Sequence, residues 1–294
     1  MTLEQRFHAW SESLRRRIGD RITSIVPGEH GAVAAALVNG EQGAIPEDLQ
    51  EAYRVAGLAH LLSISGLHMS LLAAVVFFVI RRLLALVPFI ALRIDTKKAA
   101  AWAGLAATAF YFIISGMSIP AMRSFVMIAV VMLAILLDRT ALSMRTIAWA
   151  ALLLMAVFPD AVIGASFQMS FLAVLALIAL YEQAWLQIAW RSADGRFLVM
   201  RAVGLYLVGL VVTDIVAGGG TSLFAAYHFN RLPVYSAITN LISTPLTGVV
   251  ILPATLLGLL LMPFGGDAPF FHIMGAGVTM LDEIVQAVAT WPHA

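Results

Sequence analysis

Long apolar stretches separated by short polar loops dominate the sequence. Between Arg54 and Arg81 no residue is charged. A helix over residues 60–80 would be about 31 Å long at 1.5 Å per residue, which matches the hydrocarbon thickness of a bilayer. This stretch is therefore predicted to be the first membrane span.

Further apolar stretches of helical length follow it. Pro120 is predicted to begin one of these helices, because proline suits a first helical turn and not a helix interior. The run Gly218-Gly219-Gly220 is expected to end another. The further expected helices cover residues 99–114, 120–137, 146–158, 161–181, 202–217 and 269–291.

The uncharged stretch 232–266 contains four prolines, Pro233, Pro245, Pro253 and Pro263. We expect two short or broken helices here, which membranes tolerate where the backbone lines a protein interior or a watery cavity. The whole pattern predicts an all-α fold, a polytopic membrane helical bundle with about seven to nine membrane segments, some of them broken or re-entrant.

Composition supports this class. Of 294 residues, 61% are hydrophobic and only 12% are charged, whereas soluble domains are roughly half apolar and a quarter charged. The formal net charge of +1 gives no bulk basicity that would indicate a nucleic-acid partner. The absence of cysteine excludes disulfides, thiolate metal sites and a cysteine nucleophile.

Basic residues concentrate in alternate loops, which the positive-inside rule assigns to the cytoplasm. This orientation places residues 1–55 outside, although they hold six arginines. We therefore expect the chain to be the middle of a longer protein whose upstream helices carry this segment across. Residues 1–55 would form amphipathic helices at the membrane surface, and residues 56–294 would be embedded. The basic loop residues are Arg81, Arg82, Arg93, Lys97, Lys98, Arg139, Arg145, Arg191, Arg196 and Arg201.

The first half of the first expected span is unusually polar, with His60, Ser63, Ser65 and His68. An ionisable residue in a membrane helix costs about 2.5–3.5 kcal/mol on insertion scales, so each needs a reason. Two readings stay open: these residues pack helices through hydrogen bonds, or they line a water-filled conduit or substrate site. An unbroken helix turns about 80° over eight residues, so both imidazoles on one metal are not expected.

Other polar residues offer similar alternatives. Arg123, one turn into its helix, would either extend to the membrane interface or form an anion or phosphate site at the positive helix end. Gln168 is expected to tie helices together, and Asp214 to pair with an arginine. The remaining polar candidates are His228, Asn230, Arg231 and Asn240.

No nucleotide-binding GxxxxGK[ST] loop, no HExxH or HxHxDH metal motif and no GxSxG nucleophile motif occurs in the sequence. Nothing in the sequence therefore supports ATP hydrolysis or zinc chemistry. We expect the chain not to be an enzyme and to need no cofactor.

Four sequence motifs follow one another along the chain: "YRVAGLAHLLSISGLHMSLLA", "SGMSIPAMRSFVM", "FPDAVIGASFQMSFLAVLAL" and "FNRLPVYSAITNLISTPL". In order and spacing they resemble the membrane-embedded domain of the ComEC family of bacterial competence proteins, from about Pro27 to the C-terminus. Ser124 stands where the family commonly has alanine, and Met169 where leucine is commoner. The OB-like and metallo-β-lactamase-like domains of many family members are not found here.

The resemblance implies a multi-pass channel in the bacterial cytoplasmic (inner) membrane that passes single-stranded DNA inward during natural transformation. Its partners would be single-stranded DNA, membrane lipid and separate nuclease, motor and other DNA-uptake proteins; a homo-oligomer would be unsurprising. Under this reading His60, Ser63, Ser65 and His68 line the path, Arg123 and Arg231 contact phosphate, and Gln168 and Asn240 bind the strand or fix helices. Phe167, Phe171, Tyr227 and Phe229 are candidate stacking surfaces for bases.

Three rival readings remain. A secondary transporter of a small anion would use Arg123 and the broken helices near Pro245 and Pro253. An intramembrane enzyme would use His68 or His228 as general base, although no convincing nucleophile accompanies them. The chain is also compatible with an inactive fragment of a longer competence protein.

Overall fold

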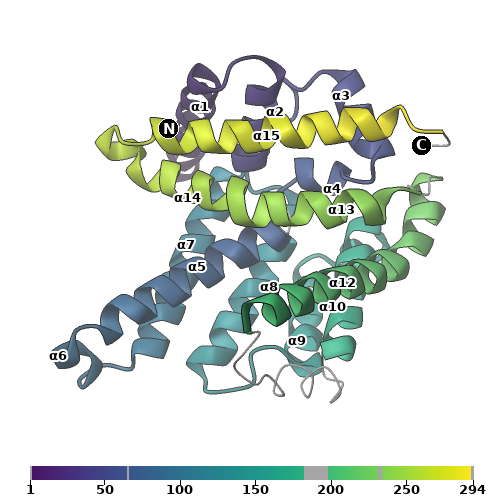
Figure 1. Ribbon diagram of the computed structural model, residues 1–294. Coiled ribbons are helices and arrows are strands. Elements are labelled where there is room, and N and C mark those ends of the chain that lie inside the picture. The colour runs from purple at the N-terminus through teal and green to yellow at the C-terminus, as the bar shows by residue number, and fades with distance from the viewer. Residues whose placement is uncertain (1, 65, 182–197, 231–233, 293–294) are drawn as a thin grey trace.

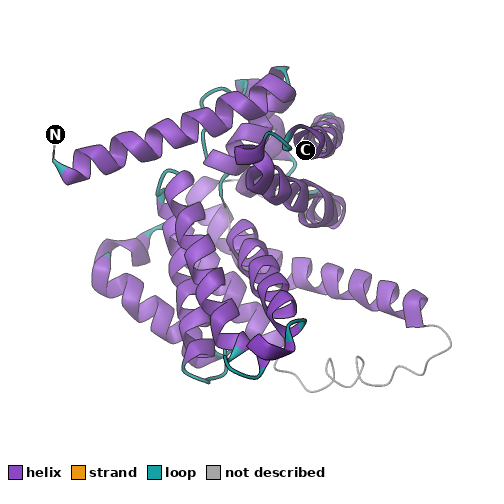
Figure 2. Ribbon diagram, turned by 90° about the vertical axis from the view of Figure 1, so that its left-hand side faces the viewer, coloured by secondary structure: helices purple, strands orange, loops and turns teal. Residues whose placement is uncertain are grey.

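A computed structural model describes residues 2–64, 66–181, 198–230 and 234–292. Every regular element in these ranges is a helix (Figure 2). The expected all-α fold is therefore confirmed. Three of the described helices are long and apolar enough to cross a membrane, at Gly66–Ala85, Ile119–Leu136 and Ser236–Phe264. The chain is an all-α membrane protein.

The N-terminal helices pack against the C-terminal one. Helices α1 (Leu3–Ile25), α2 (Gly28–Asn39) and α3 (Glu47–Val55) lie beside α15 (Ala268–Ala289), at the top of Figure 1. The α2 residues from Gly31 to Asn39 are buried in this layer. Helices do form in residues 1–55, and the surface position expected for that segment stays a prediction.

The first expected span is not one helix. Residues 60–80 are divided between α4 (Ala59–Leu62) and α5 (Gly66–Ala85), and Ser63 is extended between them. Serine favours such breaks because its hydroxyl competes for backbone hydrogen bonds. The polar half of the predicted span thus surrounds the break, and the apolar half forms α5. Short α6 (Pro88–Ala91) follows at the far end of α5.

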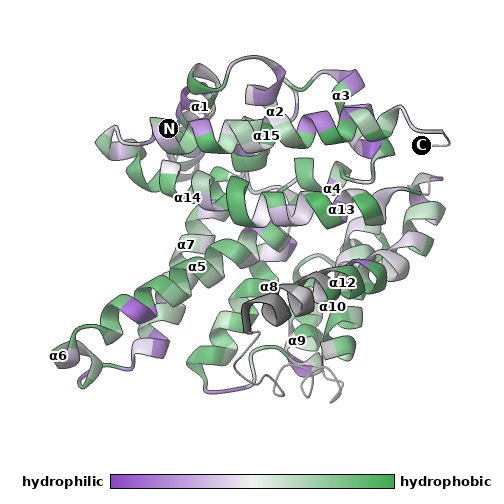
Figure 3. Cartoon of the chain, viewed as in Figure 1, coloured by the Kyte–Doolittle hydropathy of each residue, from purple (hydrophilic) through white to green (hydrophobic). Residues whose placement is uncertain are grey.

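Three antiparallel neighbours continue the chain. Helix α7 (Thr96–Ile114) packs on α5, and α8 (Ile119–Leu136) packs on α7. Pro120 lies in the first turn of α8, as predicted. Helix α9 (Met144–Val157) then packs against α8. Figure 3 shows that hydrophobic residues predominate along α5 and α8, whereas hydrophilic residues are frequent on α1 and α3.

Helix α12 (Leu198–Phe229) corrects one prediction. It follows the 3-10 turn η1 (Pro159–Ile163) and α10 (Ala165–Tyr181), and it runs through the three glycines that were expected to end it. Each glycine costs a helix about 1 kcal/mol, and packing against α10 offsets that cost. Gly220, for example, lies next to Leu172 of α10.

The proline-rich stretch forms a helix with an irregular centre. Helix α13 (Ser236–Pro245) passes into a π-helical turn, η3 (Leu246–Ile251), and then into α14 (Leu252–Leu261) and the 3-10 turn η4 (Met262–Phe264). A proline inside a helix removes one backbone hydrogen bond, and the wider turn follows Pro245 directly. The expected broken helix is confirmed. It turns at Gly265 and returns as α15 (Figure 1).

Candidate functional site

The N-terminal ends of α5 and α8 lie together. A Cβ placed on Gly66, the first residue of α5, would be 3.8 Å from Oγ of Ser124 on α8. Further along, Ala73 of α5 and Met132 of α8 both flank Gly104 of α7. The two helices therefore run in the same direction. Parallel helices direct their positive dipole ends to one place, which favours an anion there.

Arg123 lies beside this junction and is buried. Its exposed fraction is 5%, so it does not extend to the surface of the described chain. The Nε atom has no hydrogen-bond partner in the described part of the chain, and the ion pairs found among those residues do not include Arg123. A buried cation normally has a partner. We call Gly66, His68, Arg123 and Ser124 the Arg123 site.

A strained turn positions α8 and hence Arg123. Gly116 and Met117 both have left-handed backbones, with φ of 73° and 51°, and Ser118 then occupies the N-cap position of α8 without a side-chain capping hydrogen bond. The guanidinium of Arg15, from α1, covers this turn: a Cβ on Gly116 would lie 2.7 Å from Cζ of Arg15. Glycine is thus required here both for its φ and for the close approach.

Arg15 also connects the turn to the N-terminal layer. Its Nη2 donates to the carbonyl of Asn39 at 3.1 Å, and its Nη1 pairs with Glu12 at 2.6 Å. The preceding Ser115 carbonyl would lie 3.2 Å from a Cβ on Gly40. Helices α1 and α2 therefore hold the segment that begins α8.

The two histidines of the first polar stretch have different surroundings. His68 is buried on α5, whereas His60 is exposed on α4 with Nδ1 3.1 Å from the carbonyl of Gly57. Ser63 donates to the carbonyl of His60 at 3.1 Å. Ser65 lies outside the described residues. Within the described ranges no group of three or more histidines and carboxylates could hold a metal ion.

Gln168 and His228 join two helices. Oε1 of Gln168 on α10 lies 2.9 Å from Nε2 of His228 on α12, and Nε2 of Gln168 donates to the carbonyl of Val162 at 3.0 Å. The amide thus uses both of its ends within the protein. This geometry agrees with Gln168 as a tie between helices.

Asp214 was expected to pair with an arginine, and its neighbour is different. The carboxylate of Asp214 on α12 lies near the amide of Asn240 on α13, where the two helices pack together. Asn230 is exposed at the end of α12 in a left-handed conformation, with φ of 51°; asparagine tolerates this region better than most residues. Arg231 lies outside the described residues.

The aromatic candidates divide in two. Phe167 and Phe171 are buried with ring centroids 4.3 Å apart and pack in a core cluster with α9, so they serve the fold. Tyr227 is exposed on α12. The side chain of Phe229 lies outside the described residues.

Sequence reasoning missed two polar networks, each built on a buried carboxylate. Asp282 of α15 accepts from Oη of Tyr53 at 2.6 Å and lies 2.6 Å from Nδ1 of His30. Burial, with the nearby carboxylate, raises the pKa of Tyr53 far above its usual value. Arg21 donates two hydrogen bonds to Asp267, at 2.7 and 3.2 Å, and thereby lowers the pKa of that carboxyl. The carboxylates were visible in the sequence, but their partners were not.

Comparison with known proteins agrees with this architecture. A protein family described as "Competence protein" matches residues 37–294. The chain is 33% identical to "Competence protein ComA" of Neisseria gonorrhoeae, over 85% of this chain and 32% of that protein. It is 25% identical to "ComE operon protein 3" of Bacillus subtilis (strain 168), over 94% of this chain and 33% of that protein.

A third relative, "Uncharacterized protein YcaI" of Escherichia coli (strain K12), is 30% identical over 80% of this chain and 29% of its own length. The chain therefore spans about a third of the length of these relatives. No solved structure matches it.

Proposed function

The chain belongs to the competence protein family, and from this premise we propose that it forms part of a channel in the bacterial cytoplasmic membrane that passes single-stranded DNA inward during natural transformation. It would act there as a conduit and not as an enzyme. Nuclease and motor activities would come from other proteins or other parts of the gene product.

The observation that carries this proposal is the buried, unpaired charge of Arg123. Arg123 lies in the first turns of α8, next in sequence to Ser124, which neighbours the first residue of α5, and it pairs with none of the carboxylates among the described residues. The planar guanidinium fork matches the oxygen atoms of a phosphate. Each phosphate of a moving strand could thus supply, in turn, the anion that the described residues do not.

A small number of cations also suits passage. Non-specific affinity for nucleic acid increases with the number of phosphates neutralised, so a path lined by many arginines would retain the strand. A few cations among hydroxyls and imidazoles would guide phosphate without holding it. His60, Ser63, Ser65 and His68 remain the proposed polar lining, and Arg231 a second phosphate contact.

The neighbouring polar pairs have a supporting role in this proposal. The contact between Gln168 and His228 fixes α10 to α12, and that between Asn240 and Asp214 fixes α12 to α13. Buried hydrogen bonds of this kind specify a single helix arrangement. These residues would therefore maintain the shape of the path.

A small-anion transporter is the second candidate, because the same unpaired Arg123 could bind a free anion. The irregular helix at η3 adds to this reading, since broken helices form the substrate sites of many transporters. Such a transporter would saturate with a small solute, and its rate would not depend on the length of a DNA strand.

Labelled DNA supplied to a deletion strain separates these functions. The strain would be complemented with the full-length gene product, and DNase-protected label would be scored outside and inside the cytoplasmic membrane. We expect deletion to leave protected DNA outside and complementation to restore label inside. If deletion leaves internal label unchanged, the conduit function is wrong, and uptake of small anions by the purified protein in vesicles becomes the decisive assay.

A further inference from the structure

The hairpin of α5 and α7 ends in an apolar tip. Residues 83–94, which include α6, form this hairpin tip, and Figure 1 shows it projecting from the rest of the molecule. Leu86, Phe89 and Leu92 are exposed by 76%, 64% and 88%. The other exposed apolar side chains of the tip are Leu83, Val87 and Ile94.

Most of the tip lies beyond a full membrane span. Helix α5 has 20 residues and ends at Ala85, and 20 residues already measure about 30 Å, the thickness of the hydrocarbon core. A connection at this level would ordinarily be polar, because it meets water. Six exposed apolar side chains together form a patch of the kind that marks an interaction surface.

Cations flank the tip on both sides. Arg81 and Arg82 precede the tip near the end of α5, Arg93 lies within it, and Lys97 and Lys98 follow it. Two carboxylates lie close to these cations. Asp95 caps α7 by accepting from the backbone N–H groups of Lys97 and Lys98. Asp138, which follows α8, lies 2.7 Å from Nζ of Lys98 and 3.8 Å from Nζ of Lys97.

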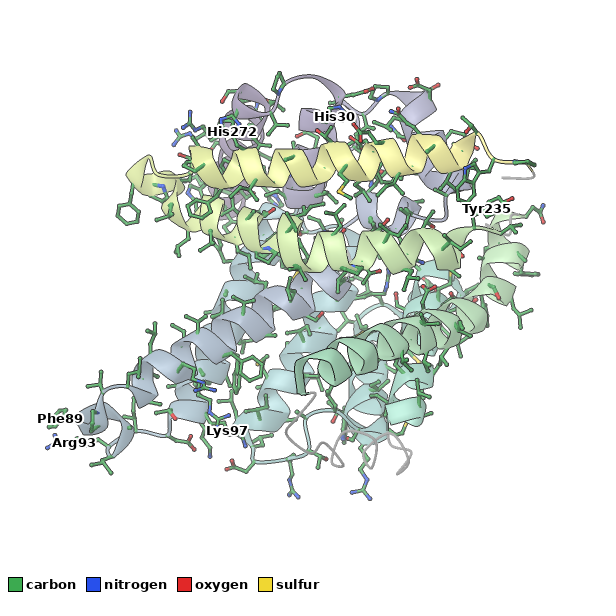
Figure 4. The ribbon with its side chains drawn as sticks, in the orientation of Figure 1. His30, Phe89, Arg93, Lys97, Tyr235 and His272 are labelled. Carbon is green, nitrogen blue, oxygen red and sulfur yellow. The ribbon has the colours of Figure 1, made fainter. Side chains whose placement is uncertain are left out.

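The three arginines therefore have no carboxylate partner among the described residues, and two of them lie beside aromatic rings. The guanidinium of Arg93 is 4.0 Å from the centroid of Phe89, and that of Arg81 is 6.0 Å from the centroid of Phe77. Figure 4 shows Phe89 and Arg93 together at the end of the tip, with Lys97 farther back, toward the body of the molecule. Each pair places a cation directly next to an apolar side chain.

We propose that the hairpin tip binds the anionic phospholipid surface of the cytoplasmic leaflet. Its apolar side chains would enter the boundary between headgroups and acyl chains, to a depth of about 5–10 Å. Arg81, Arg82 and Arg93 would contact lipid phosphates. Charge complementarity selects this occupant, because the patch combines apolar side chains with three arginines that have no carboxylate partner among the described residues. The contact would fix the position of α5, and so of the Arg123 site at its other end, relative to the membrane.

The absence of cysteine allows a direct test. Leu92→Cys would carry a spin label in the full-length protein, in vesicles of phosphatidylcholine alone or with phosphatidylglycerol. Collision with oxygen reports lipid contact, and collision with a water-soluble nickel complex reports water contact. Thr140→Cys, in the exposed loop after α8, is the matched control. A second set would add Arg81→Gln, Arg82→Gln and Arg93→Gln.

With phosphatidylglycerol, we expect the label at position 92 to be several-fold less accessible to nickel than the label at position 140. The three glutamine substitutions should restore nickel access at position 92. Equal nickel access at both positions would overturn the proposal, and so would insertion that is independent of phosphatidylglycerol. Protection that appears only after addition of cytosolic protein would assign the tip to a protein partner instead.

Discussion

His30 and Asp282 are 252 residues apart in the sequence, yet Nδ1 of one lies 2.6 Å from Oδ2 of the other. The contact joins α2 to α15, and Tyr53 of α3 donates to the second oxygen of the same carboxylate. Asp282 is fully buried. The carboxylate of Asp282 therefore connects α2, α3 and α15. Helix α2, together with α1, supports the turn before Arg123.

Substitution of Asp282 should strongly destabilise the protein. Asp282→Ala removes the acceptor of Tyr53 and the partner of His30, and loss of a buried partner of this kind costs about 3 kcal/mol. The midpoint of thermal unfolding in detergent, followed by tryptophan fluorescence, measures the effect. The neighbouring Glu283 is exposed, so Glu283→Ala should leave the midpoint nearly unchanged. Equal effects of the two substitutions would contradict the role of this network.

The contact between Arg21 and Asp267 should make stability depend on pH. Because Arg21 donates to it, the carboxyl of Asp267 has a pKa below the ordinary 3.8. The contact thus stabilises the fold above that value, and the contribution is lost as the pH falls through the lower pKa of the folded state.

Arg21→Gln should therefore lower the unfolding midpoint only slightly at neutral pH, because Arg21 is partly exposed and solvent screens the contact. The difference in unfolding midpoint between Arg21→Gln and the unsubstituted protein should shrink as the pH falls below 3.8. Unfolding midpoints across this range measure it, with Arg17→Gln, at an exposed position of α1, as the control. A constant difference at every pH would disprove this origin.

The turn at Gly116 offers a graded test of backbone strain and close packing. In Gly116→Ala the new methyl group would face the guanidinium of Arg15, and the backbone φ is positive. Gly28→Ala has a positive φ but no close neighbour, and Gly43→Ala has neither. A positive φ costs alanine about 1–2 kcal/mol. Unfolding midpoints should fall most for Gly116→Ala, less for Gly28→Ala and least for Gly43→Ala. Addition of Arg15→Ala should recover part of the Gly116→Ala loss, and no recovery would argue against the contact.

Removal of the charge of Arg123 should stabilise the protein. A buried cation without a partner is unfavourable, so Arg123→Met should raise the free energy of unfolding by about 1 kcal/mol or more. Functional sites commonly have such a cost. Lys98→Met, which removes an exposed and paired cation, should bring no gain. Equal or lower stability of Arg123→Met would show that the guanidinium is satisfied in the fold.

Local signals in the sequence predicted local structure well. Pro120 placed the start of α8 correctly because proline constrains its own turn. The prolines of residues 232–266 indicated an irregular helix, and η3 follows Pro245. The prediction that the glycines at 218–220 end a helix was wrong, because their helix penalty is small compared with the packing of α12 on α10.

Long-range contacts were beyond such signals. Tyr53 and Asp282 are 229 residues apart, and nothing near either residue in the sequence encodes their pairing. The sequence did indicate that Arg123 lies within the membrane region at a helix start. That no described carboxylate pairs with it depends on the arrangement of all the surrounding helices, so only the structure could show it.

The most direct test of the Arg123 site as a phosphate contact is to measure how much labelled single-stranded DNA reaches the cytoplasm. The deletion strain would carry the full-length gene product with Arg123→Gln, Arg123→Lys or the control Arg17→Gln, each at matched membrane abundance. We predict that Arg123→Gln lowers internal label about tenfold while external protected label persists, because a charged hydrogen bond is worth about 1.5–3 kcal/mol. Arg123→Lys should retain part of the activity, and Arg17→Gln all of it. Unchanged internal label with Arg123→Gln would contradict the account.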